Sequence, residues 1–197
     1  MRSSRFRTGQ KKGCDSVILK VLITEAASLL GVAVREELSN LHELRLISGR
    51  SNARKGIVRG NLLEPAEAEK AVAGMEALVY IPRSLTTPAP TSPEEEHAEL
   101  DAATRATYHL YMAAIRAGVK KIMHVSSLSV MEGWPKDYIV TEIWSPCPAP
   151  SARSLGFYLS EEISREVTRE SEMFVTCLRM ATLQVRRAQR RRRLPSR

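Results

Sequence analysis

Residues 20–31, KVLITEAASLLG, decide the fold of this chain. The segment 16–24 has the length of a strand and contains two apolar triplets, 17–19 and 21–23, separated by Lys20. Small residues follow it, and a helical spacing of apolar residues then extends from Leu29 to Leu38. The stretch therefore predicts a strand, a tight turn and a helix in that order.

The same alternation continues along the chain. Further strands are expected over residues 44–47, 57–61, 77–81, 119–125 and 174–178, and further helices over 65–73, 92–117 and 155–171. The run at 77–81 is apolar throughout, which is typical of a strand covered on both faces, as in a parallel sheet. Strands separated by helices predict an α/β protein with a doubly wound parallel sheet.

Local signals support the helix boundaries. Ser92 provides a capping oxygen, Pro93 fits the first helical position, and Glu95 at the third position completes a helix start. Gly74 and Gly118 follow predicted helices, where glycine commonly ends a helix. These residues indicate where the second and third helices begin or end.

The net charge of +8 lies at the ends of the chain. Residues 1–20 carry a net charge of +5 and residues 184–197 carry +7, whereas residues 21–183 carry −4. We therefore divide the chain into a basic N-terminal extension (1–16), a single domain (17–183) and an arginine-rich tail (184–197). Such a tail binds nucleic acid or an anionic membrane by releasing counterions, but a solvated end is the more common role and the one we expect.

Composition excludes several other classes of protein. No apolar run reaches the roughly 18 residues that a membrane span requires. The basic first residues lack the apolar core of a secretory signal, which predicts a cytoplasmic protein. Cys14, Cys147 and Cys177 are widely spaced and are expected to be reduced thiols, and the four histidines show no metal-ligand spacing, so no metal site is predicted.

Several landmarks, taken in chain order, resemble the extended short-chain dehydrogenase/reductase family, and within it the NAD-dependent epimerase/dehydratase group. Residues 20–24 followed by Gly31 resemble its first strand and glycine turn, and residues 60–62 (Gly-Asn-Leu) resemble its Gly-Asp-Leu element near the adenine. Residues 113–127 resemble the helix and the serine-bearing strand, and residues 141–158 resemble the approach to the catalytic tyrosine. The resemblance implies a Rossmann-like NAD(P)-binding-type domain, here with most of the substrate subdomain missing. It also implies a homodimer formed through the third and fourth helices.

The resemblance assigns NADP or NAD binding to seven residues: Thr24, Ser28, Leu30, Gly31, Arg50, Asn61 and Leu62. The family's turn has three glycines, and the corresponding positions here are Glu25, Ser28 and Gly31. A carboxylate at the helix N-terminus is expected to repel phosphate, and Ser28 adds a side chain where close backbone contact is needed. Weak cofactor binding is therefore expected. Arg50 favours NADP over NAD, or it is a solvated loop residue.

The resemblance also implies catalytic roles for Tyr158, Ser127 and Glu162. The family uses a tyrosine, a lysine four residues later, and a serine or threonine on the preceding strand. Glu162 stands where the lysine is expected and lacks the positive charge that favours a phenolate. Leu128 stands at the serine position, with Ser127 or Ser129 as replacements. Alternatively, Tyr158 is a semi-buried aromatic with a solvated hydroxyl, and the pair Ser126-Ser127 only ends a strand.

Two hypotheses on function follow. The first is a non-catalytic or weakly binding regulatory module that retains the NAD(P)-binding fold with eroded cofactor and catalytic motifs. The alternative is an active NAD(P)-dependent oxidoreductase or epimerase that acts on a nucleotide-sugar or a small carbonyl or hydroxyl substrate. Fold alone does not separate the two hypotheses.

Overall fold

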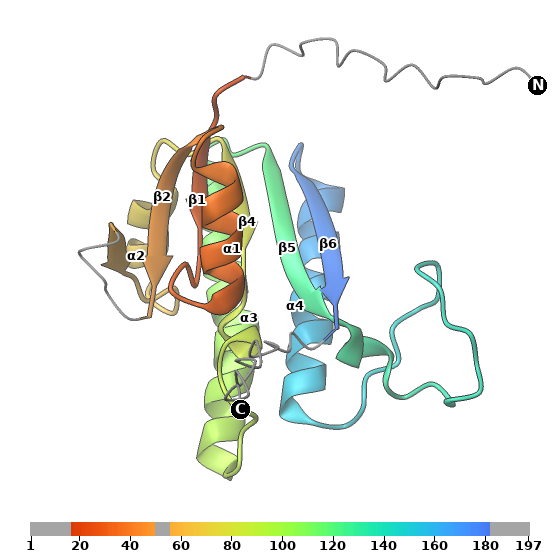
Figure 1. Ribbon diagram of the computed structural model, residues 1–197. Helices are drawn as coiled ribbons and strands as arrows, with labels where there is room; N and C mark the ends of the chain where they lie inside the picture. Colours follow the sequence, from red (N-terminus) through yellow and green to blue (C-terminus); the bar gives the residue numbers. More distant parts are fainter. Residues whose placement is uncertain (1–16, 50–55, 182–197) are drawn as a thin grey trace, which may run out of the picture.

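The computed structural model describes residues 17–49 and 56–181, and these residues form a layered α/β domain (Figure 1). Its elements are β1 (Lys20–Ile23), α1 (Leu29–Leu38), β2 (Glu43–Ser48), β3 (Ile57–Arg59), α2 (Pro65–Val72), β4 (Ala77–Tyr80), α3 (Pro93–Arg116), β5 (Lys121–Ser127), α4 (Ala152–Glu170) and β6 (Phe174–Met180), with two short 3-10 helices, η2 (Arg83–Leu85) and η3 (Leu128–Met131). The basic extension 1–16, Arg50 and the arginine-rich tail lie outside the described residues. What we expect of them therefore stays a prediction.

The sheet has six strands in the order β3-β2-β1-β4-β5-β6. Every neighbouring pair is parallel. This is the doubly wound order of a Rossmann-like fold, so the predicted fold class is confirmed. The last strand reaches Met180, two residues beyond the predicted end, because pairing with β5 continues as far as Ser127 and Met180.

Side chains of the central strands alternate between two apolar cores. Leu22, Leu78 and Ile122 belong to the core that faces α2, α3 and α4. Ile23 and Val79 belong to the core that faces α1. Figure 1 shows the same division, with α1 in front of the sheet and the other helices behind it. Since successive strand residues point to opposite faces, continuous apolar runs are needed to fill both cores.

The predicted boundaries of α2 and α3 are present within one residue, whereas α4 begins at Ala152 rather than at residue 155, because the Ser151 hydroxyl caps it by accepting a hydrogen bond from the Ser154 amide. The Ser92 hydroxyl accepts a hydrogen bond from the Glu95 amide at 3.3 Å at the start of α3. Gly74 and Gly118, just after α2 and α3, have φ angles of +71° and +74°, a region in which glycine is favoured. None of the helices within 17–49 and 56–181 is long and apolar enough to cross a membrane.

A buried polar cluster joins β5 to α3 and α4. His124 is fully buried, and its Nδ1 atom lies 2.6 Å from the Ser164 hydroxyl and 2.9 Å from the Tyr111 hydroxyl. Its Nε2 atom lies 3.3 Å from the Ser160 hydroxyl. Burial lowers the pKa of His124 to about 3. The imidazole is therefore neutral in the folded protein at neutral pH.

This cluster predicts an acid-sensitive domain. In the unfolded chain the His124 imidazole takes up a proton below its ordinary pKa of 6.5, whereas in the folded protein it does so only near pH 3. Its contribution to stability is therefore complete above about pH 6.5 and is lost as the pH falls, by roughly 2 kcal/mol between pH 7 and 5. Urea unfolding over this range should show a shallower pH slope in His124→Asn than in the natural protein. His97→Asn, a change at an exposed histidine of α3, is the control and should leave the slope unchanged.

Candidate functional site

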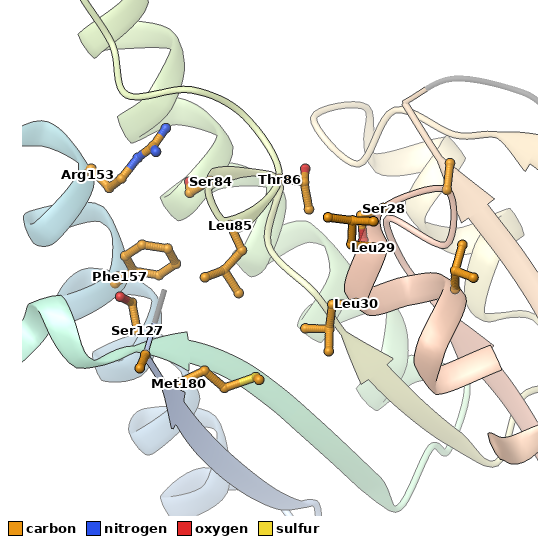
Figure 2. Close-up of a pocket in the computed structure, with 13 residues that line it drawn as sticks. Ser28, Leu29, Leu30, Ser84, Leu85, Thr86, Ser127, Arg153, Phe157 and Met180 are labelled. Atoms are coloured by element: carbon orange, nitrogen blue, oxygen red, sulfur yellow. The ribbon is translucent and has the colours of Figure 1, made fainter. Parts of the chain in front are cut away.

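A cleft of about 530 Å³ opens at the carboxyl ends of the strands. In the sheet, β1 lies between β2 and β4, so the order in which the strands are added reverses direction at β1. Ligands of doubly wound sheets bind in the crevice at this reversal. Figure 2 shows α1 on one side of the cleft and α4 with the ends of β5 and β6 on the other. Labelled lining residues are Ser28, Leu29, Leu30, Ser84, Leu85, Thr86, Ser127, Arg153, Phe157 and Met180.

A second, smaller pocket of about 60 Å³ lies at the carboxyl ends of β2 and β3. Thr24, Glu25, Asn61 and Leu62 are among its lining residues. Five of the seven predicted cofactor residues line two separate hollows: Ser28 and Leu30 line the large cleft, and Thr24, Asn61 and Leu62 line the small pocket. Gly31 is not among the described lining residues of either, and Arg50 lies outside the described residues.

Gly31 holds α1 tightly against the turn that follows β1. A Cβ atom at this position would lie 2.3 Å from the Glu25 carbonyl oxygen and 2.7 Å from the Ala26 Cα atom. Both atoms belong to the backbone, so only glycine fits without a shift of the helix. This is the role of the third glycine in a dinucleotide-binding turn, close packing of helix on strand.

Ser28 is the N-cap of α1. Its hydroxyl accepts a hydrogen bond from the Gly31 amide at 3.0 Å. Free amides at a helix N-terminus are the groups that bind phosphate, and here the chain itself occupies one of them. A phosphate that reached this amide would have to displace the serine hydroxyl.

The Glu25 side chain points away from the N-terminus of α1. The backbone of Glu25 has a φ angle of +44°. Its carboxylate accepts a hydrogen bond from the Ser48 hydroxyl at 3.2 Å and from the Gly49 amide at 3.4 Å, and it lines the small pocket rather than the large cleft. The expectation that this carboxylate faces the helix N-terminus is therefore wrong. The left-handed backbone conformation and the two hydrogen bonds place it at the end of β2 instead.

Thr24 ties the same turn to β4. Its hydroxyl donates a hydrogen bond to the Ile81 carbonyl and accepts one from the Ile81 amide, both at 2.8 Å. Both groups are buried. The hydroxyl is thus fully used in holding the ends of β1 and β4 together at the floor of the site.

The α4 residues that line the cleft are not the two predicted catalytic residues of this helix, Tyr158 and Glu162. Arg153 and Phe157 line the cleft, whereas Tyr158 is half-buried and is absent from the described lining residues. Glu162 lies instead in an apolar groove between α3 and α4. The aromatic ring beside Ser127 is therefore Phe157, which has no hydroxyl (Figure 2).

Ser127 lines the cleft at the end of β5, and its hydroxyl accepts a hydrogen bond from the Ser129 amide at 3.1 Å. Leu128, which stands at the family's serine position, is 48% exposed and does not line the cleft. Of the three predicted catalytic residues, the structure thus brings only Ser127 to the cleft.

A buried ion pair lies directly beneath this wall. The Glu161 carboxylate is 4% exposed and accepts hydrogen bonds from the Ser126 hydroxyl and from the Arg179 guanidinium, with Nη2 and Oε2 2.8 Å apart. The ion pair raises the pKa of Arg179 above its ordinary value. Sequence reasoning missed this pair, and the signal was a carboxylate four residues after Phe157 on the same face of the helix.

Arg153 connects α4 to the opposite rim. Its guanidinium donates to Glu99 of α3 at 2.7 Å and to the Thr87 carbonyl at 3.0 Å, and it also donates to the Pro88 carbonyl. These contacts hold the proline-containing connection after η2 against the start of α4. The charge of Arg153 is therefore already paired at the edge of the cleft.

The site has the features of a dinucleotide-binding site. The crevice at the strand reversal, the close packing at Gly31 and the pocket at the end of β2 match the three places where a dinucleotide contacts such a fold. The described lining residues of the large cleft, however, include no histidine, tyrosine or carboxylate. Within the same described part of the chain, no group of three or more His, Cys, Asp or Glu side chains is placed to hold a metal ion.

Comparisons with known proteins agree with this geometry. The model of the NAD-dependent epimerase/dehydratase family matches residues 18–196. A short-chain dehydrogenase/reductase superfamily protein from Agrobacterium tumefaciens, solved with bound NAD, is 28% identical with a TM-score of 0.71, covering 81% of this chain and 48% of that one. For uronate dehydrogenase from Agrobacterium tumefaciens the identity is 21%, the TM-score 0.70 and the coverage 80% and 59%. For the UDP-glucose 4-epimerase of Thermus thermophilus in complex with NAD, the values are 18%, 0.68, and 82% and 54%.

The chain spans about half the length of these solved structures, between 48% and 59% of each. The two likenesses below 25% identity support the fold alone. A comparison with curated proteins gave no match.

Proposed function

This chain belongs to the NAD-dependent epimerase/dehydratase family, and from that premise we propose that it is a binding module that takes up NAD(P) weakly in the cleft without transferring hydride. The large cleft would receive the pyrophosphate and nicotinamide, and the small pocket would receive the adenosine. When bound, the nicotinamide supplies hydride chemistry in enzymes of this kind. The described residues that line the cleft would position the cofactor, but they include no histidine, tyrosine or carboxylate that could act as its general acid or base.

One observation supports the proposal above all: Phe157, which cannot exchange a proton, lines the cleft where catalysis would require an ionisable side chain. General acid–base catalysis requires a side chain within hydrogen-bond reach of the reacting atom. The Phe157 residue is 2% exposed and lines the cleft, as does Ser127, whereas the nearest tyrosine in sequence, Tyr158, is not among the described lining residues. An unassisted serine hydroxyl is a poor acid and a poor base at neutral pH.

The test is a calorimetric titration with NADH and with NADPH. We expect saturable binding at the weak end of the usual range, weaker than about 100 μM. Thr86→Trp, which fills the cleft from its rim, should abolish this binding, and Leu41→Trp, at a half-exposed site outside the cleft-lining set, should not. Absence of saturable binding, or binding that Thr86→Trp leaves unchanged, would contradict the proposal.

The alternative is an active oxidoreductase or epimerase, and the placement of Ser127 in the cleft is the observation that favours it. Of the similar solved structures, one is a complex with UDP-glucose and NAD and another is the UDP-glucose 4-epimerase in complex with NAD. UDP-glucose with NAD is therefore a suitable probe. Formation of NADH or of an epimeric sugar nucleotide that Tyr158→Phe abolishes would establish the enzyme and refute the binding-module proposal.

A second copy of this chain is the partner that the family resemblance implies. The groove between α3 and α4 is lined by Met112, Ile115 and Ile163, and the neighbouring Tyr108 is 52% exposed. These apolar side chains support a dimer through the two helices. The dimer stays a prediction, as does contact of the arginine-rich tail with nucleic acid.

A further inference from the structure

The small pocket contains a carboxylate at an unusual place. Glu25 follows β1, yet its side chain reaches the carboxyl end of β2, where it accepts hydrogen bonds from Ser48 and Gly49. In dinucleotide-binding folds an acidic residue from the end of the second strand binds the ribose 2′-hydroxyl of NAD. Here the described residues at that strand end are Ser48 and Gly49, neither of which is acidic.

The backbone supports a dedicated position for this carboxylate. Among the described residues, Glu25 is the one non-glycine residue with a positive φ angle, +44°. A side chain in the left-handed region is strained, and such strain persists only where the surroundings hold it in place and often where it serves function. The contacts to Ser48 and Gly49 hold it in place here.

From these observations we propose that Glu25 takes the place of the missing acid of the second strand, accepts hydrogen bonds from the hydroxyl groups of the adenosine ribose, and thereby makes the site prefer NAD to NADP. The inference rests on the proposed binding of NAD(P) in this cleft. It also reverses the preference for NADP that Arg50 predicts from the sequence.

The chemistry of the two ligands explains the preference. An ionised carboxylate has about four lone-pair sites, and the contacts to Ser48 and Gly49 use two of them, so acceptors remain for a ribose diol. NADP carries a phosphate on the 2′-oxygen in place of the hydroxyl. That group has no proton to donate at this point and places like charge beside the carboxylate.

Arg83 is the rival determinant, because it lines the same pocket and a guanidinium attracts a 2′-phosphate. Its Nη1 atom and the Glu25 carboxylate are both 3.9 Å from the position of a Cβ atom placed on Gly49. The two side chains thus approach the same spot from different elements. In the described structure, however, Glu25 is the side chain that accepts the hydrogen bonds from the Ser48 hydroxyl and the Gly49 amide.

The experiment measures the ratio of the dissociation constants for NADPH and NADH by calorimetry in the full-length protein and three variants. We expect the natural protein to bind NADH at least about tenfold more tightly than NADPH. Glu25→Gln keeps the shape but removes the charge, and Glu25→Gly removes the side chain and suits the positive φ angle. Both should bring the ratio to within about threefold of one. Arg83→Gln should leave the preference for NADH in place.

The outcomes separate this inference from the proposed function. If neither cofactor binds saturably, the proposed function fails and the inference fails with it. If cofactor binds but NADPH is preferred, or if Glu25→Gln leaves the ratio unchanged, the inference is wrong while the binding function stands. If the Glu25 variants keep the ratio of the natural protein and only Arg83→Gln changes it, selection belongs to Arg83 and the inference is also overturned.

Discussion

Replacement of Arg179 by methionine is expected to lower the free energy of unfolding by about 3–5 kcal/mol. The Glu161 carboxylate is 4% exposed, and Arg179 provides its only opposite charge among the described ion pairs. Without the guanidinium, a buried charge remains with the Ser126 hydroxyl alone to solvate it. Since domains of this size are stable by about 5–15 kcal/mol, the variant should unfold at markedly lower urea concentration.

The control is Arg165→Met on the same helix as Glu161. Arg165 pairs with Glu162 at 2.8 Å, but its side chain is 58% exposed, and exposed pairs contribute little. Equal losses in the two variants would show that the Glu161–Arg179 pair is not a special support of the α4 wall. Glu161→Gln combined with Arg179→Met removes both charges and should recover part of the loss, because no unpaired charge is left buried.

Replacement of Gly31 by alanine is expected to destabilise the domain by at least about 2 kcal/mol and to weaken NAD(P) binding in parallel. Inside a helix this change normally stabilises a protein, by up to about 1 kcal/mol, so the sign of the effect is itself diagnostic. The reversal is expected because the added methyl group would lie 2.3 Å from the Glu25 carbonyl oxygen. To relieve that contact α1 must move away from the turn, and the cleft wall moves with it.

Gly60→Ala is the matched control for this variant. A Cβ atom at Gly60 would lie 3.5 Å from the Ile47 side chain, an ordinary contact with an atom that can move. Urea unfolding should therefore separate the two alanine variants by well over about 1 kcal/mol. A stability of Gly31→Ala equal to that of Gly60→Ala would mean that the turn adapts freely and that Gly31 is not required.

The strands and helices were predictable because their signals are local. The apolar run at 77–81 and the Ser92-Pro93 helix start depend on neighbours within a few residues, and both features are present in the structure. The last strand was predicted too short because Arg179 breaks its apolar pattern. In the structure Arg179 lies within β6 and pairs with Glu161 of α4. The two residues belong to different elements, so local sequence patterns do not reveal this contact.

The site was less predictable, for two physical reasons. The face of α4 that packs on the sheet is formed by Phe157 together with Ser160, Glu161 and Ser164, all buried, so hydrophobic periodicity does not reveal it. Consequently the sequence did not show that Phe157 rather than Tyr158 faces the cleft. The direction of the Glu25 side chain depends on a positive φ angle and on partners in β2, neither of which the residues 20–31 disclose.

The contacts of Arg153 have a consequence for the thermodynamics of ligand uptake. They fix the connection after η2 and the first turn of α4 in one arrangement before any ligand arrives. Ordering a loop on association consumes conformational entropy, and a rim that is already ordered avoids that loss. The affinity of this cleft is therefore determined by the contacts it makes with its ligand, without an added entropic cost of ordering this part of the rim.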